Sequence, residues 1–185
     1  MIRAATEADA PAMGHLLVTT WLTAHKGQIP EGQWQARQAN WTPAVSAQGW
    51  AETLRAMAAG DDPDYCIYLA VATAVSEPES TPIIGLVMGG AARAGSWADA
   101  GEIYVLYVRA DRQGQGIGKR LLATAVHHLA QLGLTKLVIG CLANNYASAW
   151  VLYEAWRTKV GELQTEDEGF VERQVIYGWQ DSSYY

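Results

Sequence analysis

The chain has 185 residues, of which half are apolar and 17% are charged. This composition is typical of a globular protein with one buried core. The net charge of -6 argues against nucleic acid as a partner, because phosphates would be repelled, whereas it suits a cationic ligand such as an amine. The start lacks the features of a signal peptide and no later stretch is long and apolar enough to span a bilayer, so we expect a cytoplasmic protein with no membrane partner.

The two cysteines, Cys66 and Cys141, are far apart and each lies within an apolar run. Buried free thiols in a reducing compartment explain them better than a disulfide or a metal site. No metal is expected.

The first part of the chain predicts a short strand and two helices. Ile2 to Ala5 is the strand, Thr6 caps the first helix, and apolar residues at helical spacing carry that helix to about Ala24. A second helix is expected from Val45 to Ala59. After the first helix, Gly27, Pro30 and Gly32 break the pattern into a loop or short turn. The rest of the segment between the two helices is aromatic but poorly periodic, and no element is predicted there.

Three strands and a long helix are predicted in the middle of the chain. Tyr65–Thr73 and Ile83–Gly90 are rich in β-forming residues and flank a polar turn, which favours an antiparallel hairpin. Glu102–Val108 is the next strand. From Gly116 the period changes to that of an amphipathic helix, which Gly133 ends.

The last part of the chain predicts a strand at Lys136–Leu142, a helix at Ala147–Arg157, and a hairpin of Val160–Gln164 with Phe170–Trp179. The order of elements is therefore β-α-α-β-β-β-α-β-α-β-β. It indicates a mixed α/β fold, and the absence of repeats and linkers indicates a single domain over residues 1–185.

The most informative stretch is the glycine turn between the third predicted strand of the middle segment and the helix after it. A turn of this kind directs several backbone N–H groups outward, and the helix dipole adds about half a positive charge there. A pyrophosphate group is the natural occupant. The turn consists of Gln113, Gly114, Gln115, Gly116, Ile117, Gly118 and Lys119.

Two common phosphate-binding motifs do not fit this turn. A Walker loop needs glycine five residues before Gly118 and serine or threonine after Lys119, but the chain has Gln113 and Arg120 there. A dinucleotide fingerprint needs a different glycine spacing early in a βαβ unit. Both motifs are excluded.

Gln113, Gly116 and Gly118 match the pattern Gln/Arg-x-x-Gly-x-Gly/Ala between an apolar strand and an amphipathic helix. In this the chain resembles the GNAT superfamily of acyl-coenzyme A dependent N-acyltransferases. The resemblance extends to the order of the strands and to a final hairpin that ends in an aromatic residue near Trp179. It implies a mixed, mostly antiparallel central sheet with helices on both faces, a splayed pair of strands at the acyl-coenzyme A site, and acetyl-coenzyme A as co-substrate.

The resemblance also implies which residues hold the donor. The backbone of Leu106, Tyr107 and Val108 would pair with the pantetheine arm beside a bulge, and the amides from Gln113 to Lys119 would hold the pyrophosphate. Asn145 would bind the pantetheine, although the spacing of the motif leaves Asn144 as an alternative. Lys119 and Arg120 either reach a phosphate or form a solvated helix face.

The resemblance also implies two candidates for acid–base chemistry. An amine must lose a proton before it attacks a thioester, and Glu102 is the candidate base, directly or through a water molecule; the alternative is an exposed glutamate at a strand end. The departing thiolate needs a proton, and Tyr153 is the candidate donor; the alternative is a packed helix aromatic. No serine has the setting of a nucleophile, so direct transfer in a ternary complex is expected.

Half of the eight tryptophans lie in the segment that forms the acceptor side in the family, and they are Trp21, Trp34, Trp41 and Trp50. Three alternatives are open for these residues: they line an aromatic pocket for a cation, they pack in the core, or they contact a second copy in a homodimer. Trp21 is the best candidate for substrate binding. The expected acceptor is a small-molecule primary amine, with a protein N-terminus or lysine as second choice and a non-catalytic acyl-coenzyme A sensor as a different class of protein.

Overall fold

The computed structural model describes residues 1–61, 64–72, 83–93, 97, 99–145, 158–167 and 170–179. The predicted helix Ala147–Arg157 and the polar turn between the strands of the first hairpin lie outside the described residues.

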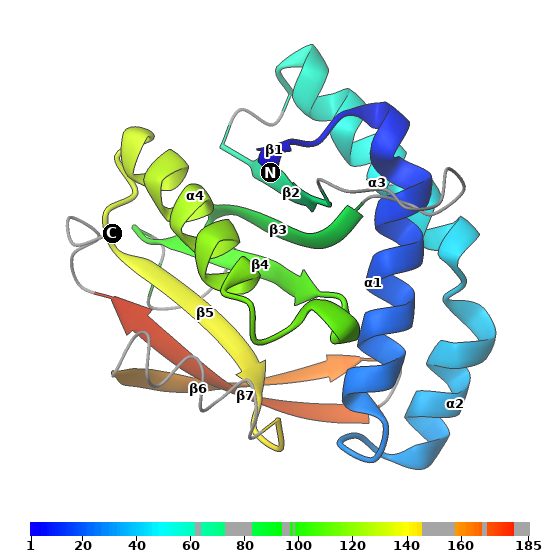
Figure 1. The fold of residues 1–185 in the computed structure, drawn as a ribbon. Coiled ribbons are helices and arrows are strands. Elements are labelled where there is room, and N and C mark those ends of the chain that lie inside the picture. Colours follow the sequence, from blue (N-terminus) through cyan, green and yellow to red (C-terminus); the bar gives the residue numbers. More distant parts are fainter. Residues whose placement is uncertain are drawn as a thin grey trace.

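A seven-stranded sheet runs through the molecule in the order β1-β2-β3-β4-β5-β7-β6 (Figure 1). Neighbouring strands are antiparallel except β4 and β5, which are parallel. The mostly antiparallel central sheet expected from the resemblance is confirmed. The strands are β1 (Ile2–Ala4), β2 (Cys66–Val71), β3 (Ile83–Ala91), β4 (Gly101–Val108), β5 (Leu137–Leu142), β6 (Lys159–Asp167) and β7 (Phe170–Trp179).

Four α-helices accompany the sheet in the described part of the chain, and no helix there is long and apolar enough to cross a membrane. The predicted bounds of the first two long helices and of the helix after the glycine turn agree with the structure to within a few residues. The helices are α1 (Ala10–His25), α2 (Glu31–Asn40), α3 (Pro43–Ala59) and α4 (Ile117–Gln131), with short 3-10 turns at Glu7–Asp9 and Ala110–Arg112.

Residues 26–30 form a turn, in agreement with the predicted break after the first helix, but residues 31–40 form helix α2, which the predicted order of elements lacks. This helix buries only Gln33, so it lacks the apolar stripe by which a helix is found in a sequence. It is tied to α1 by the Trp34 indole, whose Nε1 donates to the carbonyl of Leu22 at 3.0 Å.

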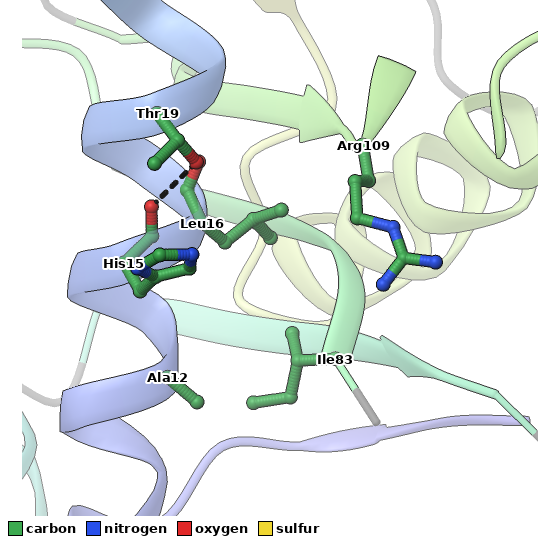
Figure 2. Close-up of a pocket in the computed structure, with 6 residues that line it drawn as sticks. All are labelled: Ala12, His15, Leu16, Thr19, Ile83 and Arg109. Atoms are coloured by element: carbon green, nitrogen blue, oxygen red, sulfur yellow. Dashed lines mark hydrogen bonds between the residues drawn. The ribbon is translucent and has the colours of Figure 1, made fainter. Parts of the chain in front are cut away.

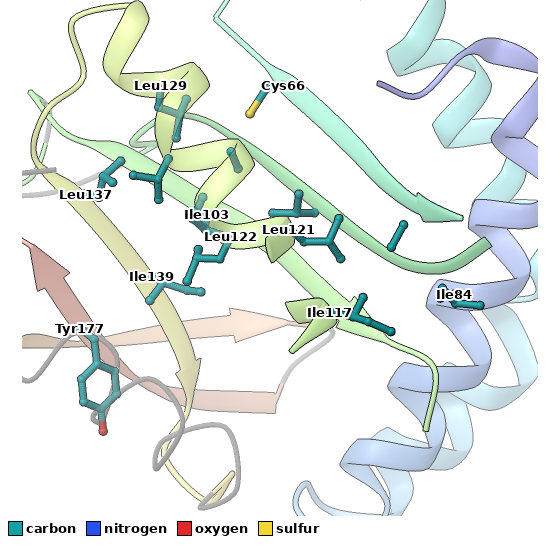
Figure 3. Packing of buried hydrophobic residues seen from close by; sticks show 14 residues of the cluster. Cys66, Ile84, Ile103, Ile117, Leu121, Leu122, Leu129, Leu137, Ile139 and Tyr177 are labelled. Carbon is teal, nitrogen blue, oxygen red and sulfur yellow. The ribbon is translucent and has the colours of Figure 1, made fainter. Parts of the chain in front are cut away.

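The helices cover both faces of the sheet, as expected. On one face, α1 and α3 enclose a core that includes Met13, Leu69 and Leu86. On the other face, α4 packs Leu121 and Leu129 against the sheet (Figure 3). Burial of these apolar side chains stabilises the packing of the helices on both faces of the sheet. The ends of the strands remain available for a site.

An irregularity in β4 shapes the centre of the sheet. Met88 of β3 lies opposite Val105, and Gly89 lies opposite Ile103, so Tyr104 is the extra residue of a β-bulge. The parallel pairing of β4 with β5 ends at Ile103, opposite Ile139. Beyond this point the two strands separate, which is the predicted strand splay.

Both cysteines are free thiols, as predicted. Cys66 is buried in the core beneath α4, and burial raises the pKa of its thiol to about 11. Cys141 is half-buried on β5, and burial raises the pKa of its thiol as well. Both groups therefore stay protonated at neutral pH.

Candidate active site

The part of β4 beyond the bulge has one open edge. The main chain of Leu106, Tyr107 and Val108 pairs with β3 on one side, and its register with β5 has ended on the other. The side chains of Leu106 and Val108 pack against the core beneath α4, whereas Tyr107 packs on the face of α1. The unpaired backbone groups are therefore directed into the gap between β4 and β5, where an extended ligand can add as a strand.

The glycine turn follows this edge directly. Gly114 and Gly116 have φ values of +73° and +72°, a region that other residues rarely adopt. The Gln113 side chain closes the turn, because its Nε2 donates to the carbonyl of Val108 at 3.0 Å. Gln113 thus holds the turn against the end of β4 and leaves the main chain to meet a ligand.

The N-terminus of α4 is open to an anion. The first helical bond runs from the amide of Arg120 to the carbonyl of Gly116 at 3.1 Å, and no side chain caps the amides before it. There is no acidic residue in the first turn, where Lys119 and Arg120 are exposed. Free amides, the helix dipole and two cations together make this end electropositive.

Glu102 lies at the point where β4 and β5 part, one residue before Ile103. Its carboxylate is not a free strand-end group. Arg93 Nη2 donates to its Oε1 at 2.7 Å, and the main-chain amide of Arg93 donates to its Oε2 at 3.1 Å. The Glu102 hydrogen bond raises the pKa of Arg93. Oε2 also accepts from Nε of Arg93 at 3.4 Å, whereas Oε1 retains a further lone pair, so the ion pair still allows Glu102 to accept a proton through water at Oε1.

The Arg93 guanidinium lies 4.2 Å from the ring centre of Tyr104, the bulge residue. Tyr65 meets the same ring edge-on, with centroids 5.8 Å apart. The Tyr104 hydroxyl donates to the carbonyl of Ala91. These contacts fix the bulge and place Arg93 beside Glu102. Neither Arg93 nor Tyr104 was among the site residues predicted from the sequence.

The two asparagines after β5 have different surroundings. Asn145 is buried, and its main-chain amide donates to the carbonyl of Leu142 at 2.9 Å. The Asn144 side chain reaches toward the carbonyl of Gln28 at 3.4 Å, in the connection between α1 and α2. Tyr153 lies outside the described residues.

The connection between α1 and α2 spans the opening between the parted strands. At its start, the His25 ring lies 6.5 Å from the Tyr107 ring on β4. Gln28, three residues later, contacts Asn144 beyond the end of β5. The segment therefore closes one side of the gap into which the β4 backbone is directed.

On the far side of this connection, α2 contacts β7. The Gln33 side chain is completely buried, and its Nε2 donates to Oε1 of Glu172 at 2.7 Å although the two residues are 139 positions apart. Figure 1 shows the end of α1 and the start of α2 beside the β6–β7 hairpin. No sequence pattern marks either residue, because a contact over this separation is made only by the tertiary fold.

Aromatic rings gather on the same side of the gap. Trp21 stacks on His25 with centroids 4.5 Å apart and meets Trp41 edge-on at 5.6 Å. The Arg37 guanidinium lies 5.8 Å from the Trp21 ring centre. The structure thus brings Trp21 together with Tyr107, through His25, at the acceptor side of the gap.

His25 is a buried histidine that the sequence analysis did not select. Its Nδ1 donates to the carbonyl of Trp21 at 2.9 Å, and burial lowers its pKa despite the opposing influences of that bond and of the Glu172 charge. The imidazole is therefore neutral at pH 7, with Nδ1 protonated and Nε2 able to accept a hydrogen bond.

A small pocket of about 160 Å³ lies between α1 and the ends of β3 and β4 (Figure 2). Its cation, Arg109, is paired with Asp111 at 2.6 Å. The pocket is smaller than typical ligand pockets, contains no predicted site residue, and is assigned no role. Its lining residues are Ala12, His15, Leu16, Thr19, Ile83 and Arg109.

Two parallel strands separate here, and the glycine turn beside them begins a helix. This combination defines a class of α/β proteins whose site suits an extended ligand that carries phosphate. The family model described as the acetyltransferase (GNAT) family matches residues 30–156, and the chain belongs to this family.

Comparison with individual proteins gives the same fold. An uncharacterised N-acetyltransferase of Bacillus subtilis, YuaI, is 29% identical over 110 residues, which cover 59% of this chain and 62% of that relative, less than two thirds of its length. Two crystal structures are similar over 97% of this chain and 98% of their own. One is the PaiA N-acetyltransferase of Thermoplasma acidophilum in complex with coenzyme A, with 14% identity and a TM-score of 0.67. The other is a ribosomal-protein-alanine N-acetyltransferase of Brucella melitensis, with 22% identity and a TM-score of 0.63.

Proposed function

We propose that the protein transfers an acetyl group from acetyl-coenzyme A to a primary amine in a direct ternary complex. The observation that carries this proposal is the open edge of β4 from Leu106 to Val108, continuous with the uncapped amides of the glycine turn. Together they offer an extended edge for pantetheine and an anion site for pyrophosphate. Family membership and the coenzyme A bound to the similar Thermoplasma structure support the donor.

In the proposed complex, the acyl arm lies in the gap and the phosphates lie at α4. The amides from Gln113 to Lys119 bind the pyrophosphate, and the backbone of Leu106 to Val108 pairs with the pantetheine. Asn145, buried after β5, binds the pantetheine from the opposite side of the gap. Gly114 and Gly116 serve because only glycine readily adopts their positive φ values.

The reaction needs two proton transfers. The neutral amine attacks the thioester carbonyl to form a carbon–nitrogen bond, and the intermediate then breaks the carbon–sulfur bond to release the coenzyme A thiolate. Glu102 accepts the proton of the attacking amine through water at Oε1, because the amide and Nε of Arg93 both donate to Oε2. Tyr153 protonates the departing thiolate.

The acceptor in this proposal is a small-molecule amine. A protein N-terminus or lysine is the alternative acceptor, and the similar Brucella structure is named for acetylation of a ribosomal-protein alanine. Trp21 and the rings around it form an aromatic wall that suits a cationic small molecule.

The experiment is a screen of coenzyme A release from acetyl-coenzyme A against a library of amines, amino acids and peptides. Release that depends on a small amine, with the acetylated amine identified by mass spectrometry, supports the proposal. Release with N-terminal peptides alone would assign the protein acceptor. Binding of acetyl-coenzyme A without release by any acceptor would favour a sensor.

A further inference from the structure

We propose that Glu172, positioned by Gln33, binds a second positive charge on the acceptor, one that stays protonated while another amine of the same molecule is acetylated. This inference rests on the proposed function and specifies its substrate class: a diamine or a longer polyamine.

Glu172 differs from the other half-buried carboxylates of the described chain. Asp9 and Glu102 each bind an arginine, with side-chain exposures of 12% and 21%. Glu172 accepts one neutral hydrogen bond at Oε1, from Gln33, and no lysine or arginine of the described chain lies within ion-pair distance of it. A carboxylate removed from water without a cation is costly, and a cationic ligand would compensate it.

Two amide oxygens near Glu172 are buried without a hydrogen-bond donor. Gln33 has a fixed orientation, because its Nε2 must face the carboxylate, and its Oε1 is then buried without a partner. The Oε1 of Gln28, in the same connection, is buried without a partner as well. An ammonium group carries three donors and no acceptor, which is the complement of such surroundings.

The nearby titratable and charged groups do not neutralise Glu172. Burial lowers the pKa of His25, so this imidazole is neutral at pH 7. Lys26 lies over the Trp34 ring at 5.4 Å, and Arg37 lies over the Trp21 and Trp41 rings. Both cations of the α1–α2 region are thus directed to aromatic rings, and neither is paired with Glu172.

Glu172 lies beside the proposed reaction site. The amide of Ala143 donates to the carbonyl of Arg173 at 2.8 Å, which places the neighbouring Glu172 next to the end of β5. Its partner Gln33 follows closely after Gln28, whose carbonyl Asn144 contacts beside the gap. A carboxylate here stabilises the protonated form of any amine that it binds, and so opposes attack by that amine. Its role is therefore to hold the ammonium group that does not react.

The test uses three acceptors that share a five-carbon aminoalkyl chain and differ at the far end: 1,5-diaminopentane (cationic), 5-amino-1-pentanol (neutral) and 6-aminohexanoate (anionic). The wild type should prefer the diamine. Glu172→Gln should raise the KM for the diamine by about tenfold or more, because one partner of a partly desolvated charge pair is lost. The KM for the alcohol and for acetyl-coenzyme A should change less than about twofold.

Two further variants complete the test. Gln33→Met keeps the volume of the side chain but removes the bond to Glu172, and should lower the ratio of kcat/KM for the diamine to kcat/KM for the alcohol. Glu162→Gln on β6 makes the same charge change at an exposed residue that Lys159 pairs, and should leave the preference intact.

An equal KM for the diamine in wild type and Glu172→Gln would overturn the inference, as would an equal fall of kcat with all three acceptors, which would assign Glu172 to the reacting amine. If the wild type acetylates none of them, the proposed function fails for this class. Calorimetric titration of 1,5-diaminopentane into the coenzyme A-saturated protein then decides the inference separately, since binding that Glu172→Gln abolishes supports it and absence of binding to the wild type overturns it.

Discussion

Gly116 adopts a left-handed backbone conformation at the start of α4, with φ of +72°. Asparagine and aspartate tolerate this conformation best among the other residues and are nearly equal in size. Gly116→Asp should abolish the rise in melting temperature caused by acetyl-coenzyme A, because it places a carboxylate where the pyrophosphate binds, whereas Gly116→Asn should keep part of that rise. A thermal shift titration of both variants measures the difference.

An aspartate near a helix N-terminus favours the helix, so the free Asp variant should melt no lower than the Asn variant. Equal responses of the two variants to acetyl-coenzyme A would place the pyrophosphate elsewhere.

Tyr153 is the proposed proton donor, and a substitution that hardly changes the volume of the side chain tests this role. Tyr153→Phe removes one hydroxyl and almost no volume, so the free energy of unfolding should change little. If the phenol protonates the thiolate, kcat should fall by about 10²-fold or more, with donor affinity nearly unchanged. Steady-state kinetics with a good acceptor, under conditions where chemistry limits the rate, measures this.

Unchanged turnover in Tyr153→Phe would remove the phenol from the mechanism and leave water as the proton donor.

At the scale of elements, α1 and α3 cross very closely. A Cβ on Gly14 of α1 would lie 2.6 Å from the carbonyl oxygen of Pro43 and 2.7 Å from the amide nitrogen of Ala47, both main-chain atoms of α3. Gly14→Ala should therefore destabilise the protein by about 1–2 kcal/mol, since overpacking outweighs the gain in helix propensity of about 1 kcal/mol. Urea unfolding measures the free energy of each variant.

The matched control is Gly49→Ala on α3, where an added Cβ meets no atom within 4 Å. This variant should stabilise the protein by about 0.5–1 kcal/mol, because alanine replaces glycine in a helix without a clash. Stabilisation by both substitutions would show that the two helices separate readily, contrary to the close crossing.

At the scale of the whole molecule, the donor site is made of strand β4, the glycine turn and helix α4, so a ligand that binds it stabilises only the folded chain. Acetyl-coenzyme A should stabilise the protein by about 2.7 kcal/mol at a hundredfold excess over its dissociation constant. NAD and ATP should have far smaller effects, because the glycine spacing fits neither of their motifs. Differential scanning calorimetry with each ligand measures this.

A larger stabilisation by NAD or ATP than by coenzyme A would show that the donor assignment is wrong.

Local patterns in the sequence determined most of the elements and the family. The amphipathic period from Ile117 onward, the alternating β-forming runs and the spacing of Gln113, Gly116 and Gly118 are each written within about fifteen consecutive residues. Such patterns follow from the geometry of one helix, one strand or one turn, so they can be recognised without knowledge of the rest of the chain. They were sufficient to predict a mixed α/β fold and a resemblance to the acetyltransferase family, and the resemblance in turn implied the splayed strands.

The tertiary structure decided what the sequence left open. Helix α2 is polar and is held by contacts with α1 and β7, so no apolar stripe reveals it. The bulge at Tyr104 exists only in relation to its neighbour β3, and the ion pair with Arg93 shows that the carboxylate of Glu102 is not a free group at a strand end. The Gln33–Glu172 contact joins residues 139 positions apart. Each of these depends on the pairing and packing of distant segments, whose energies no short stretch of sequence encodes.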